Sequence, residues 1–147
     1  MTTLHNILQQ RLQTSHATAT GAHTHRLLQH IFIDTDNTTG EPILVEKIRQ
    51  NPNIARLFCS ASKTEVPVAG TINNRFISRR IDRLLIDDST KTISILDYKT
   101  DINHDTFYKQ YVYQIQEYTQ LLHQIYPEHN IVGYILWTHD FILERVV

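Results

Sequence analysis

Apolar residues recur at helical spacing in the first third of the chain. A helix over residues 3–13 is predicted by the spacing of Leu4, Ile7, Leu8 and Leu12. Residues 14–20, rich in Thr, Ser and Ala, indicate a loop. A second helix is predicted from Gly21 to about residue 33. Pro42 suits the first turn of a third helix, and a short helix is expected within residues 51–60.

After residue 60 the apolar pattern changes to the alternation that is typical of strands. Strands are predicted over residues 65–69, 75–87, 91–99, 131–138 and 141–147. Between the third and fourth strands, a long aromatic-rich helix is predicted over residues 104–126, ended by Pro127. This order favours an α/β fold, with α+β as the alternative, in which helices flank one mixed sheet of about five strands.

The stretch ILDYKT places Asp97 and Lys99 on the same face of its strand, because side chains two residues apart in a strand share a face. A salt bridge at a solvated edge would explain the pair and would contribute only a fraction of a kcal/mol. A carboxylate that holds a metal beside an ammonium that positions a water would explain it as well. These two residues alone do not distinguish a surface salt bridge from a metal site.

The turn before this strand sets which residues face Asp97. A loop of two or four residues drawn from Asp87 to Thr90 makes paired positions sum to 177, so that Asp82 lies across from Ile95 and shares the face of Asp97. A three-residue loop would place Asp82 on the opposite face. The sequence permits both, and only the first gathers two carboxylates and an ammonium. Two such carboxylates repel unless a cation such as Mg²⁺ lies between them.

Other candidate residues carry weaker signals. His25 shares a helix face with Leu28 and Phe32 and is expected to point at the sheet, where a hydrogen-bonded core histidine is more common than a metal ligand. Glu65 opens the first strand and could be a metal ligand, a supporting group or a surface acid. On the long helix, a set at helical spacing could be core or could reach a substrate: Tyr111, Gln114 and Tyr118.

Composition narrows the class of protein. The chain has 147 residues, 41% hydrophobic and 20% charged, which is typical of a single globular domain. Its one cysteine, Cys59, excludes an internal disulfide and a four-cysteine iron–sulfur cluster, and favours a reducing compartment. We expect a cytoplasmic, soluble protein without a signal peptide, since the longest apolar run, residues 131–137, is too short to span a bilayer. The net charge of −1 argues only weakly against a nucleic-acid partner.

Taken in order, these segments resemble the RecB-family nuclease domain of the PD-(D/E)XK superfamily, most closely the version found at the C-terminus of AddA- and UvrD-type recombination helicases. The likeness covers residues 21 to 138, approximately, and the last motif looks like the family's Q-x-x-x-Y. The matching segments are GAHTHRLLQHI with His25, the first strand with Glu65, RIDRL with Asp82, ILDYKT with Asp97 and Lys99, and QIQEY with Gln114 and Tyr118. The family's proline before the first aspartate is Ile81 here.

The resemblance implies a restriction-endonuclease-like core that hydrolyses DNA phosphodiester bonds with Mg²⁺, for which Mn²⁺ would substitute, in recombination or repair. It implies that His25, Asp82, Asp97 and the carbonyl of Tyr98 hold the metal. Lys99 would orient or help deprotonate the attacking water. The resemblance further implies that Gln114 and Tyr118 support the site or the DNA strand.

The resemblance also implies a helicase motor in cis or in trans. No glycine in this chain is followed by lysine, so the chain has no P-loop and no bound nucleotide is expected. A catalytically silent nuclease fold that binds DNA or docks a helicase is the alternative, although such copies usually lose the aspartates or the lysine. A metal scaffold based on the nine histidines is weaker, because most of them fall outside ligand spacing.

Overall fold

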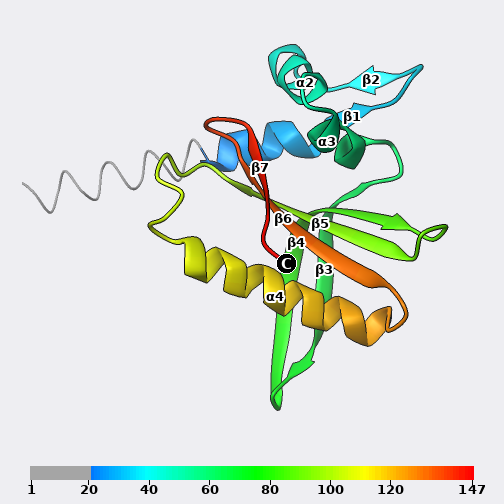
Figure 1. Cartoon of the computed structure of the whole chain (residues 1–147), viewed down its shortest axis with the longest axis vertical. Helices are drawn as coiled ribbons and strands as arrows, with labels where there is room; N and C mark the ends of the chain where they lie inside the picture. Colours follow the sequence, from blue (N-terminus) through cyan, green and yellow to red (C-terminus); the bar gives the residue numbers. More distant parts are fainter. Residues whose placement is uncertain (1–20) are drawn as a thin grey trace, which may run out of the picture.

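A five-stranded mixed sheet with helices on both faces forms the body of the protein in a computed structural model that describes residues 21–147 (Figure 1). The helix and loop predicted over residues 3–20 lie outside the described residues. The first described helix covers residues 21–29. The remaining elements are β1 (Phe32–Ile33), β2 (Thr38–Thr39), α2 (Pro42–Arg49), α3 (Pro52–Ala55), the 3₁₀ helix η1 (Arg56–Phe58), β3 (Lys63–Ile72), β4 (Arg75–Asp87), β5 (Thr92–Lys99), α4 (Tyr108–Ile125), β6 (Asn130–Trp137) and β7 (Ile142–Arg145).

The sheet has the strand order β3-β4-β5-β6-β7. Its one parallel pair is β5–β6, joined by the crossover helix α4, and the other neighbours are antiparallel. The prediction of an α/β fold with a mixed five-stranded sheet is therefore confirmed. No helix within residues 21–147 is long and apolar enough to cross a membrane.

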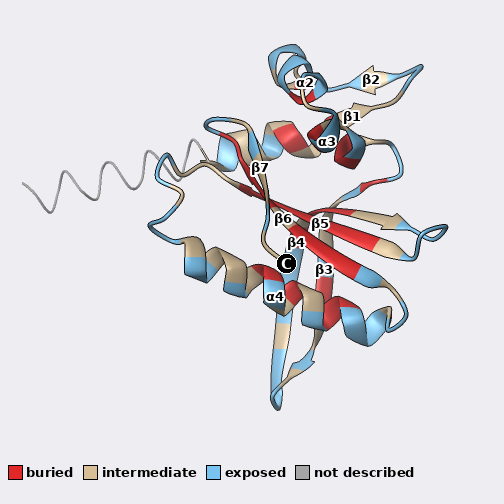
Figure 2. Ribbon diagram, viewed as in Figure 1, coloured by how far each residue is buried: buried red, intermediate tan, exposed pale blue. Residues whose placement is uncertain are grey.

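Two hydrophobic clusters cover the two faces of the sheet (Figure 2). On one face, Ile115 and Leu121 of α4 pack on the strands, and on the other face Leu28 of helix 21–29 packs with α2, α3 and η1. Glu41 caps α2 by accepting hydrogen bonds from the amides of Ile43 and Leu44, directly before Pro42 at the first helical position. The sheet is thus buried from both sides, and its strand ends carry the polar residues.

The second helix ends earlier than its apolar pattern predicts. Helix 21–29 is followed by a turn, and Phe32 lies in β1, which pairs with β2. Placing Phe32 on the helix face of His25 and Leu28 is therefore wrong, although Leu28 is fully buried as expected. Phe32 is not helical because its backbone pairs with Thr39 in the β1–β2 ribbon.

The β4–β5 register differs by two residues from the predicted one. Leu84 pairs with Ile95 and Ile86 with Ile93, so paired positions sum to 179 and not to 177. Asp87 causes the shift, because it stays in the strand and its carboxylate accepts hydrogen bonds from Ser89 and Thr90, which starts the loop at residue 88. A shift of two residues preserves the faces, whereas the three-residue loop would have exchanged them. The apolar side chains expected on the face of Asp97 do pack in the cluster under α4: Leu84, Ile86, Ile93 and Ile95.

The first strand of the sheet is twice as long as predicted. β3 extends to Ile72 and forms a hairpin with β4 through Asn73 and Asn74, both at positive φ (50° and 62°). Asn tolerates this left-handed conformation, which two-residue hairpin loops require. The hairpin extends past α4 and leaves the body of the sheet (Figure 1).

Candidate active site

An opening between β4 and β5 provides the setting for the predicted site residues. Their pairing ends at Arg83 and Leu96, after which β4 continues only with β3. The backbone amide of Tyr98, two residues further along β5, donates to Oδ2 of Asp82 at 2.9 Å. The carbonyl oxygen of Tyr98 lies 2.9 Å from Nε2 of His25, which must donate because a carbonyl only accepts. The side chains of Asp82 and His25 thus bond the amide and the carbonyl of Tyr98, which backbone groups of β4 would bond if the two strands stayed paired.

The alternation of faces along β4 is interrupted at Asp82. Arg83 points into the cluster of helix 21–29, whereas Leu84 and Ile81 both pack in the cluster under α4, although they are three residues apart. Opposite this point on β3, Glu65 has φ 52°, a left-handed conformation that is uncommon for glutamate. Asp82, two residues before Leu84, still shares the face of Leu84 and Asp97, as the sequence predicts.

Asp82 and Asp97 form a close carboxyl pair. Burial, and after it the charge of Asp97, raise the pKa of Asp82 to about 8, although the hydrogen bond from the amide of Tyr98 opposes the rise. With its pKa at this value, Asp82 keeps its proton near neutral pH, next to the carboxylate of Asp97. Asp97 is 2% exposed. One proton therefore separates two carboxylates that would otherwise repel, in a position suited to a cation.

Lys99 balances the charge of Asp97. Its Nζ lies 2.9 Å from Oδ2 of Asp97 in an ion pair whose lysine side chain is 17% exposed. The same ammonium donates to Oε1 of Gln114 at 3.1 Å and lies 4.2 Å from the centroid of the Tyr111 ring. Although this ion pair is short, the buried Oδ2 of Asp97 has no well-directed hydrogen bond among residues 21–147. Lys99 is held in place and still reaches solvent.

Helix α4 supports Lys99 through a chain of hydrogen bonds. Nε2 of Gln114 donates to the hydroxyl of Tyr118 at 2.7 Å, and that hydroxyl donates to the carbonyl of Arg80 on β4 at 3.3 Å. Burial raises the pKa of the Tyr118 hydroxyl, so the hydroxyl keeps its proton. Tyr111 donates to Oδ2 of Asp101 at 2.7 Å. The three predicted supporting residues of α4 are therefore gathered at Lys99.

The donors fit a divalent cation in chemistry. Asp82, Asp97 and the Tyr98 carbonyl offer hard oxygens, and His25 offers a nitrogen beside that carbonyl. Two ligands at about 2.1 Å and at right angles around an ion lie about 3 Å apart, which is close to the separation of His25 Nε2 and the Tyr98 oxygen. No group of three His, Cys, Asp or Glu side chains in residues 21–147 is gathered tightly enough to count as a metal cluster. The site thus consists of two groups of possible ligands, His25 with the Tyr98 carbonyl and Asp82 with Asp97, and Tyr98 is hydrogen-bonded to both His25 and Asp82.

Glu65 stands apart from these donors. Its Oε2 lies 3.8 Å from Nη1 of Arg80, and its side chain is partly exposed. Its backbone lies between Thr64, which pairs with Arg83, and Val66, which pairs with Ile81, so it sits across from Asp82. Of the roles that the sequence leaves open, this position favours support of β4.

Arg83 is a buried residue beside the candidate site that the sequence analysis missed. It is 1% exposed and donates to the Tyr98 hydroxyl at 2.9 Å and to Ser62 Oγ at 2.6 Å. It also donates to the carbonyls of Leu28 and Ile31, at the end of helix 21–29. Arg83 thus ties the helix of His25 to β4 and β5. The available signal was a charged residue on a strand face that it shares with apolar Leu85.

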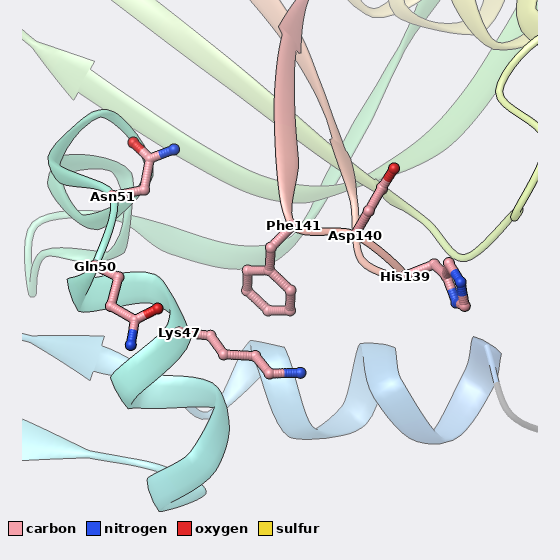
Figure 3. Close-up of a pocket in the computed structure, with 6 residues that line it drawn as sticks. All are labelled: Lys47, Gln50, Asn51, His139, Asp140 and Phe141. Atoms are coloured by element: carbon pink, nitrogen blue, oxygen red, sulfur yellow. The ribbon is translucent and has the colours of Figure 1, made fainter.

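A separate pocket lies between the C-terminal end of α2 and the turn between β6 and β7 (Figure 3). Lys47 of α2 and its C-cap residue Gln50 line one side, and Phe141, with φ 54°, lines the turn side. Lys47 Nζ lies 5.4 Å from the Phe141 ring centroid, and the side chain of Asp140 pairs with His104. The pocket holds a single carboxylate, so it does not repeat the chemistry of the opening.

No family model matches the chain, and no curated protein matches it.

Proposed function

We propose that the protein is a metal-dependent deoxyribonuclease of RecB type that hydrolyses phosphodiester bonds. The observation that carries the proposal is the meeting of Asp82, Asp97 and Lys99 at the opening between β4 and β5, with the Tyr98 carbonyl and His25 beside them. The order and spacing of these residues are also those of the RecB-type motifs. A structural salt bridge would require Asp97 and Lys99 alone, and would not explain a second buried carboxyl next to them.

Each residue has a role that follows from its contacts. A divalent cation held by Asp82, Asp97, the Tyr98 carbonyl and His25 would offset phosphate charge and lower the pKa of a bound water. Asp82 must lose its proton before it binds a cation, and its neighbour Asp97 is already paired with Lys99. The ammonium of Lys99, steadied by Gln114, would orient the water or neutralise charge that develops on the phosphate.

The test is cleavage of end-labelled DNA, single- and double-stranded, by the purified chain with Mg²⁺ or Mn²⁺. We expect cleavage with either ion and none with a chelator. Asp97→Asn and Lys99→Ala are each expected to lower the rate by about 100-fold or more, because each removes a charge at the reacting phosphate.

Two exposed residues provide matched controls. Asp105→Asn and Lys109→Ala change the same residue types outside the opening and should keep the wild-type rate. Absence of both metal binding and cleavage in the wild type would rule out the proposal. Equal cleavage by the wild type and by Asp97→Asn would rule it out as well.

One observation favours a second candidate, a catalytically silent nuclease fold that binds DNA or docks a helicase. Among the residues of the described chain, no three-side-chain metal cluster is preformed, and His25 donates its ring proton to the Tyr98 carbonyl. This candidate predicts DNA binding without cleavage at any Mg²⁺ or Mn²⁺ concentration. The same assay, read beside a binding measurement, separates the two.

A further inference from the structure

The β3–β4 hairpin forms an exposed arm, defined here as residues 71–80. Eight of its ten residues are exposed, and only Ile72 and Ile77 are partly buried. Figure 2 shows the arm as pale blue and tan where it leaves the red centre of the sheet. The Asn73–Asn74 turn and a continuous ladder from Ile72–Arg75 to Val66–Ile81 hold it as a regular hairpin. Ile72 and Ile77 pack against the cluster under α4, so the packing explains one side of the hairpin and leaves its exposed side chains without a structural partner in the core.

The arm carries aromatic and basic side chains. Phe76 is 75% exposed, the same fraction as Ile102 and the highest among the exposed large hydrophobics of residues 21–147. Between residues 63 and 80 the basic residues outnumber the single acid, Glu65; they are Lys63, Arg75, Arg79 and Arg80. In a chain with a net charge of −1, this is a local concentration of positive charge.

The three arginines of the arm differ in whether an acidic side chain lies near them. Arg79 pairs with Glu117 of α4 at 2.8 Å, and Arg80 lies 3.8 Å from Glu65. Arg75 makes no ion pair or side-chain hydrogen bond within the part of the chain that the structure describes. Its guanidinium is therefore available to an anion outside the protein.

A cleft of about 310 Å³ runs between the arm and α4. Its walls include Phe76 and Tyr113, two exposed aromatic rings, and the guanidinium groups of Arg75 and Arg79. Aromatic rings beside arginines are the combination that binds an unpaired nucleic-acid strand, because bases stack on the rings while phosphates meet the cations. A duplex offers its bases no such contact, since they are already stacked.

We propose that this arm binds an unpaired nucleic-acid strand and leads it to the opening between β4 and β5. The inference rests on the proposed nuclease function for its direction and on the arm for its chemistry. The arm is continuous with the site, because Tyr118 donates to the carbonyl of Arg80 and Asp82 follows two residues later.

The length of β4 sets the expected footprint. Six residues separate Phe76 from Asp82, which is about 20 Å at 3.3 Å per residue. A stacked strand spans that distance with about six nucleotides at 3.4 Å each. Oligonucleotides longer than this reach both the arm and the opening, and shorter ones reach only one.

The test measures binding of a fluorescent single-stranded 12-mer by anisotropy, with a chelator present so that no cleavage occurs. We expect Phe76→Ala and Arg75→Ala each to weaken binding of the 12-mer by about tenfold, and the wild type to bind a 4-mer more weakly than the 12-mer. The duplex of the same sequence should bind more weakly than the single strand. Ile43→Ala, which trims a residue that is 68% exposed on α2, across the sheet from α4, is the matched control and should bind like the wild type.

Each result decides the question. Equal 12-mer affinity for the wild type, Phe76→Ala and Arg75→Ala would overturn the inference even if the protein cleaves DNA. A loss of self-association in Phe76→Ala by light scattering, with unchanged 12-mer affinity, would assign the arm to a second copy of the chain and overturn it too. Weakened binding in a protein that never cleaves would keep the arm as a strand-binding site and reject the nuclease proposal.

Discussion

Oδ2 of Asp82 accepts a hydrogen bond from the backbone amide of Tyr98, where a continued β4–β5 ladder would supply a carbonyl. Where the pairing of two strands stops, the backbone groups beyond that point lose their partners. Here the two groups of Tyr98 are satisfied by Asp82 and His25. The candidate donors are therefore brought to one place by the need to complete the hydrogen bonds of a single residue.

The stability of the metal-free protein should fall as pH rises from about 4 to 8. The folded-state pKa of Asp82, about 8, lies above its ordinary value of 3.8, so the folded protein binds more protons than the unfolded chain in this window. Ionising Asp82 next to Asp97 removes that advantage. Thermal unfolding at pH 5 and pH 8 with a chelator, compared with Asp82→Asn, measures the effect, because the variant retains the histidines that titrate in the same window.

Divalent metal should reverse this trend. Mg²⁺ or Mn²⁺ binds the ionised carboxylates, so the rise in melting temperature on adding metal should be larger at pH 8 than at pH 5. An equal pH slope in the wild type and in Asp82→Asn would show that Asp82 is not the titrating group.

Tyr118→Phe should lower activity more than stability. The change removes a hydroxyl that accepts from Gln114 and donates to the Arg80 carbonyl, so we expect a loss of about 1 kcal/mol in the free energy of unfolding. Freed from Tyr118, Gln114 holds Lys99 less firmly, and the cleavage rate should fall by about tenfold. Tyr126→Phe at the end of α4 is the control for loss of a hydroxyl, and a drop of the same size there would discredit the hydrogen-bond chain.

Arg83→Met should destabilise the fold by about 3 kcal/mol or more. Methionine fills much of the volume but leaves the carbonyls of Leu28 and Ile31 and the Tyr98 hydroxyl without their buried donor. Urea unfolding gives the difference. Arg26→Met, on the exposed side of helix 21–29, should be nearly neutral, and similar losses in both would mean that the contacts of Arg83 contribute little.

Gly133→Ala should displace α4 from the sheet. A Cβ at this position would clash with Cγ2 of Ile115, the residue next to Gln114, so we expect a loss of about 1 to 3 kcal/mol together with lower activity. Gly70→Ala is the comparison, because its Cβ would meet chiefly the mobile end of Gln124. Denaturation and cleavage assays on both variants should rank Gly133→Ala as the more damaging.

Periodicity predicted most helices and strands because the sheet buries both faces and α4 is amphipathic. It failed at the end of β3, where Thr71 is exposed and Ile72 only partly buried, too few residues to show an alternation before the Asn73–Asn74 turn. The register was wrong by two because the side chain of Asp87 determines where the loop begins. The face of Asp82 was still predicted correctly, since only the parity of the register decides it.

Only those site residues could be predicted from the sequence whose spacing along one strand or one helix places them on a common face. Asp97 and Lys99 follow from strand alternation, and Gln114 and Tyr118 from helical spacing. The helix face of His25 predicts that it points at the sheet, but its partner, the carbonyl of Tyr98, lies 73 residues away, and the hydrogen bonds of Arg83 reach back 52 and 55 residues to Ile31 and Leu28. Such contacts leave no periodic trace.

The two-sided packing of the sheet has a consequence for a newly made chain. His25 arrives with one hydrophobic layer, whereas Gln114 and Tyr118 arrive with the other, and β5 lies between them. A chain with only one layer docked has an incomplete set of donors. The proposed chemistry would therefore require both layers to be docked on the sheet, so that a half-assembled chain would be inactive.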